Sequence, residues 1–133
     1  FGTYATDDAG EFSILENPPV EGADSFVVAC IFPLTLIAVT ESETPWAVWY
    51  QFDRIRHDGF LLRIHVLLTP ELAAQPELVA RYSEQIRFIH REDIPVCDGV
   101  QRGYRSPLYV SGPLSHLEGA LWHFHRYLQR CFV

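Results

Sequence analysis

Residues 91–107 read REDIPVCDGVQRGYRSP and lie between a long amphipathic helix pattern and a short final one. Asp93 suits the N-cap of a new helix, and Pro95 suits its first turn, where proline's missing N–H costs nothing. Gly103 is typical of the residue just after a helix end, and the Ser-Pro step beyond it favours extended backbone. The stretch therefore predicts a helix from Asp93 to about Arg102.

One face of this helix would present a carboxylate among apolar neighbours. Asp93, Cys97 and Val100 recur at i, i+4 and i+7, a spacing that puts them on the same side. Two interpretations follow from this local chemistry alone. Either Asp93 is a helix cap and Glu92 a surface residue, or the carboxylate belongs to a site.

Strand-like sequence fills the first half of the chain. Residues 46–55 and 60–68 alternate between two faces, and His57-Asp58-Gly59 between them is a hairpin signal. Four main strands with short polar connections predict an antiparallel meander. The other expected segments are strands at 11–15, 25–32 and 34–40, a loop over 1–9 and a turn over 21–24.

Helical sequence fills the second half. A bend is expected near Asp93, and the capping box Ser115-x-x-Glu118 predicts the start of the last helix. Strands followed by helices predict an α+β fold, an antiparallel sheet with long C-terminal helices packed on one face. Between residues 77 and 90 the apolar stripe that should lie on the sheet consists of Val79, Tyr82, Ile86 and Ile89.

Composition narrows the class of protein. The chain has 133 residues, 48% of them hydrophobic, which suits a single domain with its own core. The net charge of −7 argues against nucleic-acid binding, and no apolar stretch approaches the ~20 residues of a membrane span. Three scattered cysteines and no signal-peptide pattern indicate a cytoplasmic protein with reduced thiols. The chain starts at Phe1 and contains no methionine, so we interpret it as part of a longer protein.

The stretch also resembles a known signature, that of the large (α) catalytic subunit of Rieske-type non-heme iron ring-hydroxylating oxygenases. The matching pattern is Glu92-Asp93-x-x-Val96-Cys97-x-x-Val100-Gln101-Arg102-Gly103-x-x-Ser106, and Tyr109-x-x-Gly112-Pro113-Leu114-Ser115-x-x-Glu118 continues it. The resemblance implies a helix-grip catalytic domain, in which a curved sheet wraps a long helix. Residues 1–133 would form the C-terminal half of that domain, without the Rieske domain.

The resemblance also implies a chemistry. In this family two histidines and one carboxylate hold a mononuclear iron with open positions for O2. Asp93 would be the carboxylate ligand of Fe(II), and Glu92 would support it or lie on the surface, with the reverse assignment left open. No catalytic residue separate from the metal site is implied. The complete enzyme would insert oxygen into an aromatic or related small organic substrate. Its electrons would come from a reductase or ferredoxin through a Rieske 2Fe–2S cluster, and its subunits would form trimers.

The other ligands that the resemblance calls for have no match in the sequence. A His-x4-His pair is missing, as are the Cys-x-His and Cys-x-x-His motifs that bind a Rieske cluster. His65 and His90 are the histidines that could approach a site, whereas His123 and His125 point about 200° apart on a helix. The chain is therefore expected to hold only part of an active site.

Several residues are candidates to line a substrate cavity. Core packing explains the apolar ones equally well, and Arg63, a further candidate, suits a cross-strand ion pair with Asp53. Two alternatives to an oxygenase domain stay open: a metal-free helix-grip module that binds an apolar ligand, and an inactive remnant. The candidate lining residues are Trp49, Gln51, Phe52, His65, Val96 and Val100.

Overall fold

The computed structural model describes residues 10–17, 19 and 24–132, which form two compact units. The first unit combines the strands with the C-terminal helix, and the second holds residues 69–113. The expected loop over 1–9 and positions 21–23 of the expected turn lie outside the described residues. In the part of the chain that is described, no helix is long and apolar enough to cross a membrane.

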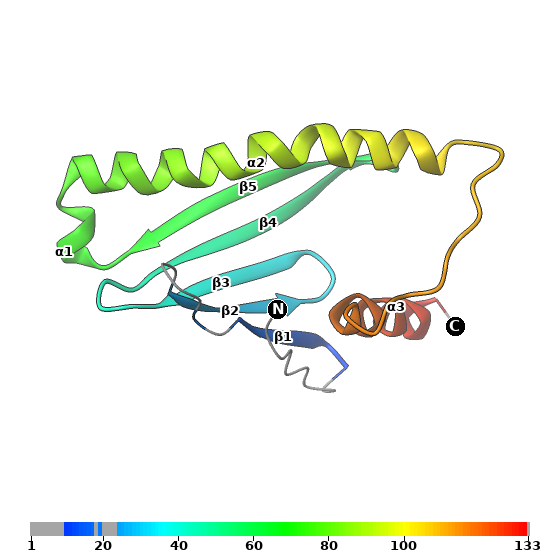
Figure 1. Ribbon diagram of the computed structural model, residues 1–133, viewed down its shortest axis with the longest axis horizontal. Helices are drawn as coiled ribbons and strands as arrows, with labels where there is room; N and C mark the ends of the chain where they lie inside the picture. Colours follow the sequence, from blue (N-terminus) through cyan, green and yellow to red (C-terminus); the bar gives the residue numbers. More distant parts are fainter. Residues whose placement is uncertain (1–9, 18, 20–23, 133) are drawn as a thin grey trace. The chain divides into compact units, whose positions relative to one another are not determined.

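Five antiparallel strands form the sheet of the first unit, in the order β1-β2-β3-β4-β5 (Figure 1). The predicted meander and the α+β class are thus confirmed. His57 and Asp58 form the turn between β4 and β5, at the position where the sequence predicted a hairpin. The strands are β1 Phe12–Asn17, β2 Ser25–Ile31, β3 Thr35–Glu41, β4 Trp46–Arg56 and β5 Gly59–Leu68.

The strand register sorts side chains onto two faces of this sheet, because successive residues of a strand point to opposite sides. Ser13 and Val48, the most buried residues of the sheet, lie on the same face. One row across that face is Ser13, Cys30, Leu36, Tyr50 and Ile64. The neighbouring row, on the other face, is Ile14, Ala29, Ile37, Trp49 and His65.

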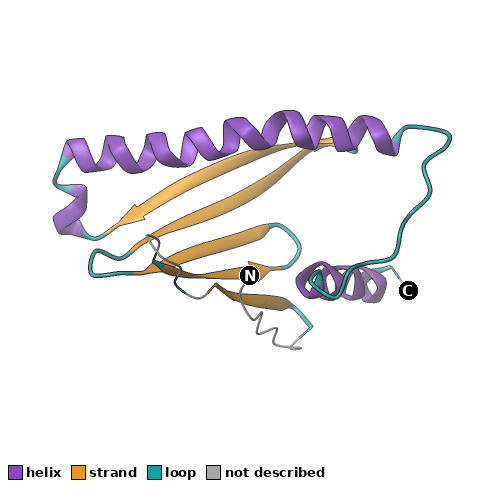
Figure 2. Ribbon diagram, viewed as in Figure 1, coloured by secondary structure: helices purple, strands orange, loops and turns teal. Residues whose placement is uncertain are grey.

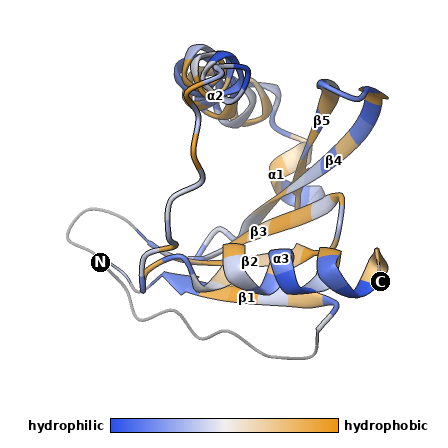
Figure 3. Ribbon diagram, turned by 90° about the vertical axis from the view of Figure 1, so that its right-hand side faces the viewer, coloured by the Kyte–Doolittle hydropathy of each residue, from blue (hydrophilic) through white to orange (hydrophobic). Residues whose placement is uncertain are grey.

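Helix α3 (Gly119–Cys131) packs against β1 within the first unit (Figure 3). The ring of Phe32, just after β2, lies 5.3 Å from that of Phe124 and 5.5 Å from that of Tyr127, centroid to centroid. Arg130 donates a hydrogen bond to the carbonyl oxygen of Gly10. Gly10 has a φ of 77°, a conformation that favours glycine. Aromatic packing and this hydrogen bond together hold α3 on the β1 edge.

Helix α3 starts later than the capping box predicted. The Glu118 carboxylate accepts a hydrogen bond from the backbone N–H of Ser115 at 2.5 Å, as a capping box requires. The Ser115 hydroxyl, however, accepts from the N–H of Leu117, only two residues on, at 3.2 Å. This closes a short turn at residues 115–118 and the helix begins at Gly119.

The second unit is helical. Helix α1 (Pro70–Ala73) is capped by the Thr69 hydroxyl, and α2 (Pro76–Tyr104) follows. Figure 2 shows α2 as one uninterrupted helix.

The prediction of a bend near Asp93 and of a new helix capped by Asp93 is therefore wrong. Pro95 lies inside the helix, where its missing N–H removes only the hydrogen bond to the Arg91 carbonyl, and the turns on both sides continue. Gly103 is likewise helical, and Arg105 is the C-cap.

Candidate functional site

Asp93 stands on the apolar stripe of α2. At about 100° per residue, the four residues of the predicted apolar stripe in the first half of the helix, from Val79 to Ile89, fall within about 40° of Asp93 around the axis. The same holds for Cys97, Val100 and Tyr104 further on. Because α2 is continuous, the two stripes that the sequence suggested separately form one, and Asp93 is the charged residue in it. The stripe consists of Val79, Tyr82, Ile86, Ile89, Asp93, Cys97, Val100 and Tyr104.

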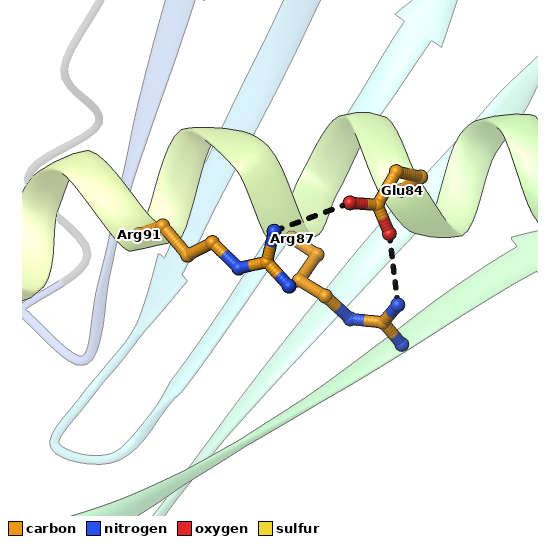
Figure 4. A network of polar contacts seen from close by, with 3 residues as sticks. All are labelled: Glu84, Arg87 and Arg91. Atoms are coloured by element: carbon orange, nitrogen blue, oxygen red, sulfur yellow. Dashed lines mark hydrogen bonds and ion pairs between the residues drawn. The ribbon is translucent and has the colours of Figure 1, made fainter.

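The arginines near Asp93 in sequence pair with Glu84 on the same helix (Figure 4). Nη1 of Arg87 lies 2.8 Å from one carboxylate oxygen of Glu84, and Nη1 of Arg91 lies 3.3 Å from the other. These three residues are about 120–180° from Asp93 around the axis. Such exposed pairs stabilise a helix by only a few tenths of a kcal/mol, roughly 0.3–0.5. Their arrangement leaves the Asp93 side of α2 without these cations.

Glu92 and His90 flank this carboxylate differently. Glu92 is about 100° away from Asp93 around the helix, so the two carboxylates project in different directions. Nδ1 of His90 donates to the backbone carbonyl of Ile86 at 2.7 Å, one turn earlier in the helix. This bond fixes the imidazole against its own helix, which continues past His90 to Tyr104.

The described residues do not complete an iron site. A single carboxylate oxygen donor suits Fe(II), and the facial arrangement typical of non-heme iron needs two histidines beside it. Within the described ranges no group of three or more histidine, cysteine, aspartate or glutamate side chains is placed to hold a metal ion. The carboxylate of Asp93 is of the chemical type that one ligand position needs, and the described residues around it do not supply the other positions.

A second cluster of polar side chains lies on one face of β4 and β5, in the first unit. Trp49 and His65 are directly opposite each other, and their rings stack with centroids 4.7 Å apart and planes 27° apart. Nε1 of Trp49 and Nε2 of His65 are both buried, and neither has a hydrogen-bond partner among the described residues. An unmet polar atom of this kind costs about 1–3 kcal/mol.

The neighbouring polar side chains on this face satisfy one another. Arg63 forms an ion pair with Asp53, as the sequence predicted, on a diagonal of the register since Arg63 itself is opposite Gln51. Nε2 of Gln51 donates to Oδ1 of Asp53 at 3.3 Å. Oδ2 of Asp53 is buried without a hydrogen bond of good geometry, but the Arg63 charge faces it in the ion pair.

The six candidate lining residues fall into three places. Trp49, Gln51 and His65 share one face of the sheet. Phe52 is on the opposite face, with its ring 5.3 Å from that of Phe60, so it does not join them. Val96 and Val100 are on α2, in the second unit.

Comparison with known proteins identifies the class to which this fold and this acidic helix belong. An antiparallel sheet followed by a long helix that carries a carboxylate on its apolar stripe is the arrangement expected of a helix-grip catalytic domain. The family model for the ring hydroxylating alpha subunit (catalytic domain) matches residues 3–132. The chain belongs to this family, whose members are non-heme iron oxygenase domains of the helix-grip type. No curated protein and no solved structure matches the chain.

Proposed function

We propose that the chain is the C-terminal half of the catalytic domain of a Rieske-type oxygenase α subunit and that Asp93 is its iron-binding carboxylate. The observation that carries this proposal is the position of Asp93. It is the one charged side chain on a continuous apolar stripe, and the nearby arginines are on the other side of α2. A carboxylate on such a stripe is costly to cover unless it binds a cation or a hydrogen-bond donor.

The complete enzyme would insert oxygen from O2 into an aromatic or related small organic substrate. Its two histidine ligands and its Rieske cluster would come from residues other than those described. A reductase or ferredoxin would supply electrons, and trimers in the cytoplasm are the assembly and location that we propose. Trp49, Gln51 and His65 are the lining candidates that the sheet brings together, while Val96 and Val100 are candidates from the helix.

Metal binding by carboxylate variants tests the proposal. Fe(II) is titrated without oxygen into the purified α subunit that contains this chain, and into its Asp93→Ala and Glu92→Ala variants. Loss of one of three ligands should weaken iron binding at least about tenfold for Asp93→Ala, whereas Glu92→Ala should change it much less. Asp98→Ala, on the far side of the same helix, is the matched control. Unchanged iron binding in Asp93→Ala contradicts the proposal, and loss in Glu92→Ala alone would exchange the two roles.

A metal-free binding module of the same fold is the second candidate. The observation in its favour is the absence of a three-ligand group within the described ranges. In that case the protein would bind its ligand equally well with and without iron, and Asp93→Ala would leave ligand affinity unchanged.

A further inference from the structure

We draw no further inference here: the strongest candidate, the exposed face of α3 on which the ring of Trp122 lies under the guanidinium of Arg126, carries none because nothing in the structure shows what covers it.

Discussion

Trp49 and His65 face each other across β4 and β5, with ring centroids 4.7 Å apart, because the register of the two strands shifts by one residue near the hairpin. The turn pairs Arg56 with Gly59, and that register continued without interruption would put Val66 opposite Trp49. The irregularity between Arg54 and Arg56 moves the pairing by one position. A one-residue shift exchanges the partner and the face of every side chain beyond it, so this local feature creates the stacked pair.

Replacement of Pro95 by alanine should stabilise α2. Proline in a helix interior costs about 3 kcal/mol because it lacks the N–H and its ring clashes with the preceding turn. Pro95→Ala restores the donor to the Arg91 carbonyl, so thermal unfolding followed by circular dichroism should shift to higher temperature. Pro70→Ala is the control, since Pro70 is in the first turn of α1, where the N–H has no partner to lose. A lower melting temperature for Pro95→Ala would show that the helix is interrupted there.

The fold class was predictable from the sequence, because hydrophobic alternation and turn residues act locally. The hairpin at His57 and Asp58 was found in this way, and so was the meander. The diagonal pair of Asp53 and Arg63 was also found, since two adjacent strands with opposite charges offer few other partners.

The continuity of α2 was not predictable by the same rules. An aspartate followed two residues later by proline satisfies the criteria for a helix start equally well when both lie inside a longer helix. The sequence did not predict the stacking of Trp49 on His65, and the reason is different. Alternation gives the face of a side chain, but a bulge decides its cross-strand partner, and the sequence carries no glycine or proline from Trp46 to Asp58 to mark one.

Glycine substitutions at two positions should act in opposite directions. Gly103 is helical, and a Cβ there would meet no atom within 4 Å, so Gly103→Ala should stabilise the protein by roughly 0.5–1 kcal/mol. At Gly10 the φ of 77° and the Arg130 guanidinium, 2.8 Å from an added Cβ, both oppose alanine, so Gly10→Ala should destabilise it. Urea unfolding measures both variants. The same sign for the two changes would contradict the backbone conformation at one of these glycines.

Removal of the Ser13 hydroxyl should not weaken the sheet. Ser13 is fully buried at 0% exposure, and its Oγ has no hydrogen-bond partner among the described residues. Ser13→Ala removes an unmet polar atom and should raise the free energy of unfolding by roughly 1 kcal/mol. Ser25→Ala is the contrasting variant, because the Ser25 hydroxyl donates to the Glu41 carboxylate at 2.6 Å and its loss should be neutral or destabilising. Urea unfolding that finds Ser13→Ala the less stable of the two would show that Oγ has a partner.

The three cysteines should differ in reactivity. Cys30 on β2 is half-buried, and this burial raises the pKa of its thiol, whereas Cys97 and Cys131 are exposed. Since the thiolate is the form that reacts, the two exposed thiols should be alkylated first by iodoacetamide near pH 8. Labelling of Cys30 should lag and should go on accelerating as the pH rises above that value, because a raised pKa moves thiolate formation to higher pH.

Peptide mapping by mass spectrometry at successive times follows each site separately. In urea the burial is lost, so the three sites should then react at similar rates, which controls for differences in local sequence. If Cys30 were labelled as fast as Cys131 in the folded protein, the side chains on the Cys30 face of β2 would be open to solvent. That result would also place the core of the first unit away from the face shared by Ser13 and Val48.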